Sequence, residues 1–195
     1  MRLALVLAAA LLLPGCAFTD AQLSIRHRDE ANFQGPLSNV PPSRFEFQAL
    51  TDTRPDQQRI GWKVNGYGQK TATITSTTPV TVIVTDAVAA GLLRNGHIVG
   101  APSDVKVSGS VTRFWFEFDP NLFTIEFIGN VEADLEFTDA KSGKAIHKGH
   151  YSGTYSKKTG GGLEATWTDV MNQALEKMVE DVMFDEELVE ALQAR

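Results

Sequence analysis

Residues 123–138 constrain the fold more than any other stretch of the chain, because apolar and polar side chains alternate there almost without interruption. Apolar or small residues fill every odd position, namely Phe123, Ile125, Phe127, Gly129, Val131, Ala133, Leu135 and Phe137. The even positions carry polar or acidic residues, apart from Ile128. This period of two is typical of a β-strand with one buried face and one solvated face. The segment therefore predicts an antiparallel sheet that is covered on one side only.

Two further long strands flank this segment in the sequence, over residues 105–118 and 145–157. Turn-forming residues separate the three strands, with Asp-Pro-Asn after the first and Lys-Ser-Gly-Lys before the last. We expect the three strands to form a meander, because consecutive strands usually lie side by side. Shorter strands are expected over residues 44–49 and 60–64, where the composition also favours an extended chain.

Two helices are predicted, and each has one apolar stripe to bury. The first follows Thr78-Pro79 and stops at Asn95-Gly96, which are typical helix-start and helix-stop residues. The second covers residues 163–183 and repeats apolar side chains at spacings of three and four. The elements together predict an α+β fold. It is a two-layer sandwich in which an antiparallel sheet, with a long three-strand meander, is covered on one face by two helices.

The buried face of the strand over residues 105–118 changes partway along the strand. Apolar residues occupy odd positions near its start, whereas the phenylalanines from Phe114 onward occupy even positions. An extra residue in one strand reverses the side on which later side chains emerge, so we expect a β-bulge near Thr112-Arg113. With a turn over residues 119–122, the expected pairs are Phe118 with Phe123, Phe116 with Ile125 and Phe114 with Phe127.

The tip of this hairpin is the candidate partner-binding element. Its strands are about 14 residues or roughly 46 Å long, whereas the helices span only about 24–32 Å, so part of the hairpin should extend beyond them. Trp115 is expected on the solvated face beside Arg113 and Glu117, and exposed aromatic clusters often mark interaction sites. The alternative is that residues 17–43 or 65–78 fold over the hairpin and bury it. The candidate residues are Phe114, Trp115, Phe116, Phe118 and Phe123.

The N-terminus has the parts of a secretory signal peptide. The basic start Met1-Arg2 precedes the apolar run Leu3–Leu13, which is shorter than the roughly 20 residues that a membrane-spanning helix needs. Pro14-Gly15 then leads to Cys16, the only cysteine of the chain. The sequence Leu-Pro-Gly-Cys resembles the lipobox of bacterial lipoproteins, which implies cleavage before Cys16 and acylation of its thiol. The usual lipobox has Ala, Ser or Thr where this chain has Pro14.

This resemblance divides the chain into three parts. Residues 1–15 are the signal peptide, residues 16–43 carry the lipidated cysteine and a flexible tether, and residues 44–195 form a single α+β periplasmic domain. The tether is expected because glycine and proline are frequent there and apolar residues are few. A short edge strand around Leu23 and Ile25 is the alternative for part of it.

The residues after the cysteine imply which membrane holds the anchor. In Gram-negative lipoproteins an Asp next to the cysteine favours the inner membrane, so Ala17 and Phe18 imply the outer membrane, with the protein facing the periplasm. Several acyl chains hold a protein firmly to a bilayer, whereas one chain holds it weakly. The net charge of −6 argues against nucleic acid as a partner. The sequence leaves the oligomeric state open.

No pattern in the sequence is typical of a catalytic or metal centre. His147 and His150 lie three residues apart on a predicted strand, so their side chains should point to opposite faces and cannot share one metal ion. His97 follows a helix end, where a structural role is favoured. Asp52 and Arg54 are expected to form a structural ion pair. The sequence therefore predicts no catalytic residue, no metal ligand and no cofactor.

Several of these features together resemble the YajG-type lipoproteins of bacteria. They are the lipobox, the strand that ends in Asp52-x-Arg54, the helix with Gly91 and Gly96, the meander, and Met-Val-x-Asp in the last long helix. The family has no settled activity. Its implied architecture is similar to that of other small envelope lipoproteins, among them activators of peptidoglycan synthases and subunits of curli secretion.

Two functions are compatible with these features. The first is a non-catalytic lipoprotein, anchored in the outer membrane through Cys16, that serves as a binding or assembly module for an envelope protein or for peptidoglycan. The second is a cell-wall-directed hydrolase, which requires two carboxylates roughly 5–9 Å apart that only the fold brings together. The lack of a catalytic pattern in the sequence favours the first function.

Overall fold

The computed structural model describes residues 19–28, 34–65, 67–120, 125–160 and 163–195. The predicted signal peptide, Cys16 and Phe123 lie outside these ranges. In chain order the elements are β1 (Ala21–Leu23), the 3₁₀ helix η2 (Pro36–Asn39), β2 (Arg44–Phe47), β3 (Thr51–Asp52), β4 (Gly61–Val64), β5 (Lys70–Ser76), α2 (Val80–Arg94), β6 (Ile98–Val99), β7 (Val105–Pro120), β8 (Ile125–Asp139), β9 (Ala145–Thr159), α3 (Glu164–Met183) and α4 (Glu186–Gln193).

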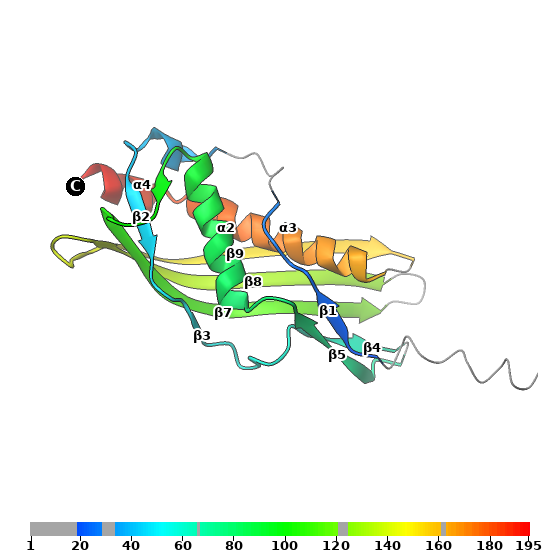
Figure 1. Cartoon of the computed structure of the whole chain (residues 1–195). Coiled ribbons are helices and arrows are strands. Elements are labelled where there is room, and N and C mark those ends of the chain that lie inside the picture. The colour runs from blue at the N-terminus through cyan, green and yellow to red at the C-terminus, as the bar shows by residue number, and fades with distance from the viewer. Residues whose placement is uncertain (1–18, 29–33, 66, 121–124, 161–162) are drawn as a thin grey trace, which may run out of the picture.

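Strand β7 is the centre of a nine-stranded mixed sheet. Along one edge it pairs over its whole length with antiparallel β8, which in turn pairs with antiparallel β9. Along its other edge it pairs in succession with three short parallel strands, β2, β3 and β4. Strands β5 and β1 continue the sheet beyond β4, and β6 continues it beyond β2. Figure 1 shows the three long strands running along the molecule.

The three-strand meander is thus confirmed, but the expectation of a purely antiparallel sheet is wrong. The second edge of β7 presents a long row of backbone N–H and C=O groups that need partners. Short segments that lack a strong periodic pattern of their own supply those partners, as Thr51-Asp52 does opposite Ser110-Val111. Their pairing is non-local, which is why the local pattern of the sequence did not predict it.

The alternation and the bulge on the long strands are confirmed. The odd-numbered apolar residues of β8 from Phe127 to Phe137 are buried against the helices, and the ladder between β7 and β8 shifts between Val111 and Arg113. Before the shift Val111 is buried, and after it Phe114 is buried, so the buried face moves from odd to even positions. The bulge keeps one continuous apolar face along the whole of β7.

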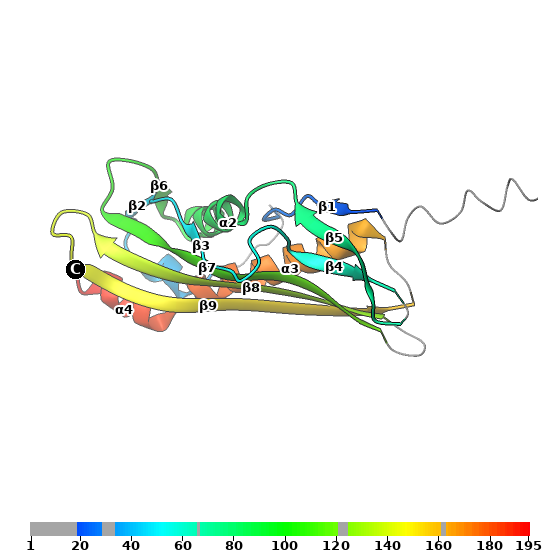
Figure 2. The ribbon, with the colours of Figure 1, turned by 90° about the horizontal axis from the view of Figure 1, so that it is seen from below.

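Helices α2 and α3 cover one face of the long strands, as Figures 1 and 2 show, and the shorter α4 follows as a third helix. The apolar stripe of α3 is buried from Trp167 to Met183, as its spacing predicted. Two glycines let α3 lie directly on the sheet. A Cβ atom on Gly129 would lie 3.0 Å from the carbonyl oxygen of Val170, and one on Gly153 would lie 2.1 Å from that of Ala174.

The flexible tether expected over residues 16–43 is wrong for the described residues 19–28 and 34–43. Ala21, Leu23 and Ile25 are buried, and β1 pairs in parallel with β5. In the second stretch, Leu37 is buried completely. The alternative of an edge strand around Leu23 is therefore the correct one, because the free edge of β5 pairs with the strand and the core accepts its apolar side chains.

Side chains of the helices hold the backbone of this N-terminal arm, residues 19–28. The N–H of Arg26 donates to Oδ1 of Asn172 at 3.0 Å, and the N–H of Arg28 donates to Oε1 of Glu176 at 2.6 Å. His27 lies between Glu176, which is 3.0 Å from its Nδ1, and the guanidinium of Arg94 on α2. The arm is thus part of the folded domain and is bonded to both long helices.

Candidate functional site

The phenylalanines of the hairpin belong to the core rather than to an exposed tip. Phe114 and Phe116 are fully buried, and Phe118 is half-buried. The ring of Trp167 on α3 lies 5.9 Å from that of Phe116 and 5.2 Å from that of Phe118, measured between centroids. Phe114 and Phe116 thus lie on the buried face, as the alternation predicted. The expectation that this part of the hairpin extends beyond the helices is wrong, because α3 reaches over it. Phe123 lies outside the described residues.

The expected pairing of the hairpin is also wrong. Phe118 pairs with Phe127, Phe116 with Gly129 and Phe114 with Val131. The pairing reaches Pro120 opposite Ile125, so β7 continues beyond Phe118, where the pattern placed its end. The new register leaves the same faces buried and exposed, because it differs from the expected one by an even number of residues.

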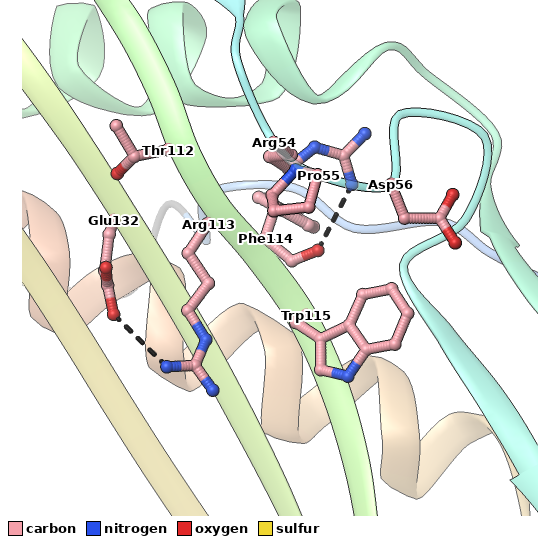
Figure 3. A pocket seen from close by; sticks show the side chains of 8 residues that line it. All are labelled: Arg54, Pro55, Asp56, Thr112, Arg113, Phe114, Trp115 and Glu132. Carbon is pink, nitrogen blue, oxygen red and sulfur yellow. Dashed lines mark hydrogen bonds and ion pairs between the residues drawn. The ribbon is translucent and has the colours of Figure 1, made fainter.

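Trp115 points away from the core, as predicted, and lines a hollow on the helix-free face of the sheet. The hollow has a volume of about 340 Å³. Its residues come from the loop after β3, from the bulge region of β7 and from β8, and they are Arg54, Pro55, Asp56, Thr112, Arg113, Phe114, Trp115 and Glu132. Figure 3 shows the indole of Trp115 beneath the loop that carries Pro55 and Asp56.

Arg54 fixes the loop that forms one wall of this hollow. Its guanidinium binds Asp52 through two hydrogen bonds of 2.9 and 2.8 Å, which confirms the predicted ion pair. It also donates to the carbonyl oxygens of Arg59, Gln57 and Phe114, at 2.8, 3.2 and 3.3 Å. Arg54 is only 6% exposed, so these bonds are largely removed from water. These bonds therefore hold the wall in one conformation.

The same guanidinium sets the charge state of Asp52. Burial alone would raise the pKa of Asp52, but the hydrogen bonds and the positive charge of Arg54 outweigh burial and hold this pKa below its ordinary value. The carboxylate therefore stays ionised well into the acid range. The pair has a structural role, since it joins the end of β3 to the backbone of β7.

The two carboxylates that line the hollow are both engaged by arginines. Oδ2 of Asp56 lies 2.9 Å from Nη1 of Arg59, and Oε1 of Glu132 lies 3.6 Å from Nη1 of Arg113. Arg113 also pairs with Glu117 at 3.0 Å. The hollow thus combines an aromatic floor with charged groups of both signs. This arrangement suits binding of a mixed apolar and polar surface better than proton transfer.

A second tryptophan lies on the same face and was not identified from the sequence. Trp62 of β4 follows Gly61, which pairs with Phe116, so its side chain emerges on the helix-free side. The guanidinium of Arg59 lies 4.5 Å from the centroid of its ring. No local signal places Trp62 on this face, because only the parallel pairing of β4 with β7 brings the two segments together.

The histidines have structural partners and do not converge. His147 Nε2 lies 2.9 Å from Asp185, whereas His150 Nδ1 lies 2.7 Å from Asp134 on the other face of the sheet, as predicted. Asp185 also accepts a hydrogen bond from the hydroxyl of Tyr151, whose pKa is raised by burial and by this carboxylate. Within the described ranges, no group of three or more His, Cys, Asp or Glu residues is placed to hold a metal ion.

Comparison with known families decides the class of protein. Residues 49–193, most of the chain, match a family described as uncharacterised lipoproteins. The chain belongs to this lipoprotein family. Membership indicates an envelope protein held by a membrane anchor, and none of the helices in the described residues is long and apolar enough to cross a bilayer. No curated protein matches the sequence.

One of three similar solved structures supports a shared fold, at low sequence identity. A protein of Xanthomonas campestris superposes with a TM-score of 0.58 at 12% identity, over 90% of this chain and 97% of that one. A candidate lipoprotein of Caulobacter crescentus reaches a TM-score of 0.47 at 16% identity, over 83% and 95% of the two chains. A lipoprotein of Neisseria meningitidis reaches 0.29 at 13%, over 71% and 99%. The first match supports a common fold, and the other two are too distant to carry an argument.

Proposed function

We propose that the protein is a non-catalytic, YajG-type lipoprotein of the outer membrane that binds another envelope protein through the helix-free face of its sheet. Cys16 carries the lipid, and Ala17-Phe18 directs the protein to the outer membrane. Membership in a lipoprotein family supports the anchor. The hollow around Trp115 is the observation that carries the binding role.

The hollow has the properties of a binding hot spot. Trp115 and Arg113 are of the residue types that most often dominate binding energy at protein interfaces. The Arg54 clamp holds the neighbouring loop in place, so little conformational entropy is lost when a partner binds. Charges of both signs surround the indole, which favours a partner that offers an apolar side chain within a ring of polar groups. A protein surface fits this description better than a glycan strand does.

The cell-wall hydrolase is not favoured as an alternative. Such an enzyme needs two carboxylates free to act as an acid and as a base or nucleophile. Asp56 and Glu132 are the carboxylates of the hollow, and each is engaged in an ion pair with an arginine. We therefore propose a binding site and no catalytic step here.

Site-specific crosslinking in intact cells tests this function. A photoreactive amino acid at Asp56, on the rim of the hollow, should crosslink to one discrete envelope protein, and the Trp115→Ala substitution should abolish the product. The same amino acid at Lys177, which is exposed on α3 at the opposite side of the sheet, is the matched control and should give no such product. Sedimentation with purified peptidoglycan is the companion assay. Binding to peptidoglycan that Trp115→Ala weakens, without any crosslinked protein, would replace the protein partner with the cell wall.

A further inference from the structure

A second and larger hollow lies at the end of the molecule where β1 begins. Its volume is about 610 Å³, within the range of roughly 300–1,000 Å³ that small-molecule sites usually occupy. Its apolar lining comes from β4, from the end of β7 and from the start of α3. The residues are Val64, Phe118, Leu163, Ala165 and Trp167, with Thr19 beside them.

Leu163 leaves this pocket incomplete. Leu163 is 81% exposed, so a large apolar side chain stands in water directly beside an apolar hollow. Trp167 also lines the pocket but is only 8% exposed. Lys63 and Glu164, which form an ion pair of 3.4 Å, add charged groups to the lining. The pocket therefore lacks an apolar body that would cover Leu163.

A fatty-acyl chain supplies such a body. The hydrocarbon covers Leu163 and lies against the rings of Phe118 and Trp167, which contact each other at 5.2 Å between centroids. Every methylene that leaves water adds to the affinity. A purely polar ligand would leave the apolar lining uncovered.

The position of the pocket indicates where such a chain comes from. Thr19 lines the pocket and lies three residues after Cys16, a stretch of at most about 11 Å when fully extended. The proposed lipid on Cys16 therefore holds the pocket close to the membrane surface. The acyl chains of the anchor itself must remain in the bilayer to hold the protein. A neighbouring phospholipid has a chain that is free to enter.

We infer that this pocket binds one fatty-acyl chain of a membrane phospholipid. The source of the chain rests on the proposed outer-membrane anchoring. The chemistry of the pocket does not, since it follows from the apolar lining and from the exposure of Leu163.

The test measures lysophospholipid binding to the purified full-length mature chain by calorimetry and native mass spectrometry. The probe carries a single palmitoyl ester and is kept below the concentration at which it forms micelles. Both the lipidated protein and the unlipidated Cys16→Ser variant should bind one molecule. Leu163→Asp should weaken binding about tenfold or more, because it places a charge at the pocket. Asp is a favoured N-cap residue, so this change should not disturb α3, which Leu163 caps.

Two controls separate the pocket from general hydrophobic binding. Leu93→Asp changes another exposed leucine, 55% exposed on α2 and outside the pocket, and should leave binding unchanged. The deacylated probe keeps the head group but has no acyl chain, so it should not bind the wild type. Binding of the deacylated probe would show that the head group is recognised instead.

Defined results overturn the inference. Equal affinities for the Leu163→Asp and Leu93→Asp variants, or no saturable binding by any form, would show that this pocket is not a lipid site. Binding by the Cys16→Ser variant alone would show that the protein's own anchor fills the pocket, which rejects the phospholipid. Normal probe binding by a protein that fails to reach the outer membrane would reject the proposed localisation and support the acyl pocket.

Discussion

The two ends of the sandwich are built on opposite principles. At the end that carries η2, β2 and β6, buried polar side chains tie separate segments together (Figure 1). Asn95 accepts the N–H of Gly35 and donates to the carbonyl oxygen of Gly91, both at 2.9 Å. Buried His97 accepts the N–H of Ser43 on Nδ1, so its Nε2 carries the proton and donates to the carbonyl oxygen of Leu37. This end is closed.

The other end, where β1 begins, is open and apolar. Leu163 and Tyr67 are 81% and 92% exposed there, and the larger hollow of the molecule lies beside Leu163. Among the described residues, Tyr67 and Leu163 are the two most exposed large apolar side chains, and both lie at the end where the chain leads back to Cys16. Buried polar contacts stabilise the closed end, whereas the open end lies next to the proposed lipid anchor and is placed to meet a membrane.

The largest effect that tests this contrast is removal of the anchor from the open end. Cys16→Ser should abolish partition into the outer membrane, because the variant has no thiol to acylate. The variant should fractionate with the soluble periplasm or remain uncleaved in the inner membrane, and Pro14→Ala, which restores the usual lipobox, should localise normally. A Ser variant that still reaches the outer membrane contradicts the lipoprotein anchor.

A pair of leucines compares the stability of the two ends directly. Leu37 of the closed end is completely buried, so Leu37→Ala should lower the free energy of unfolding by about 2–5 kcal/mol. Leu163→Ala at the open end should change it by less than about 0.5 kcal/mol, because that side chain is mostly in water. Urea denaturation measures both. Similar costs for the two variants would mean that the ends do not differ in packing.

A pair of asparagines gives a smaller and more specific effect. Asn95→Ala leaves the buried N–H of Gly35 without its partner and removes the side-chain hydrogen bond to the Gly91 carbonyl, which still accepts the backbone N–H of residue 95. The change should cost about 1–3 kcal/mol. Asn65→Ala removes hydrogen bonds to the N–H groups of Tyr67 and Gln69 in an exposed turn, where water can replace them. Its cost should stay below about 1 kcal/mol. If Asn65→Ala lowered the stability more than Asn95→Ala does, the open end would be the one that depends more on its hydrogen bonds.

The smallest effect is the pH dependence of the closed end. Burial lowers the pKa of His97, although its hydrogen bond to the Leu37 carbonyl opposes this shift. The unfolded chain therefore takes up a proton before the folded one, near the ordinary pKa of about 6.5. Stability from His97 is present above that pH and is lost as the pH falls toward the folded pKa, by at most about 1.4 kcal/mol per pH unit.

Urea unfolding at about pH 7.5 and pH 5.5 measures this dependence, with the range set by the ordinary pKa of histidine. The His97→Gln variant is the reference, since it keeps a polar side chain of similar size but has no titrating ring. The wild type should lose more stability on acidification than this variant does. Equal losses would show that His97 does not titrate in this range and that other groups carry the acid sensitivity.

Hairpin register shows the limit of periodicity as evidence. The alternation over residues 123–138 correctly predicted which side chains of β8 are buried, and the shift from Val111 to Phe114 correctly predicted the bulge. The alternation did not predict that Phe118 pairs with Phe127. Any even shift of the ladder preserves the buried face, so alternation cannot choose among such registers. The register became known only from the backbone pairing of β7 with β8 in the structure.

The candidate site could be predicted only in part for a similar reason. The outward direction of Trp115 and the pairing of Asp52 with Arg54 follow from residues close together in the chain. The bonds from Arg54 to the Phe114 carbonyl, and the placement of Trp62 on the same face, depend on parallel pairing with β7. A parallel pair joins segments that are distant in the sequence, and the residues of one strand do not indicate which other strand it pairs with.

The sequence by itself determined the lipobox pattern, the long strands with their bulge and the buried stripe of α3, because each depends on the order of neighbouring residues. Only the tertiary structure decided that the N-terminal arm belongs to the domain, that short parallel strands complete the sheet, and that a hollow opens beside Thr19. These features arise where backbone groups and apolar surfaces of distant segments satisfy one another. That requirement acts between segments, so the sequence pattern within any one of them does not contain it.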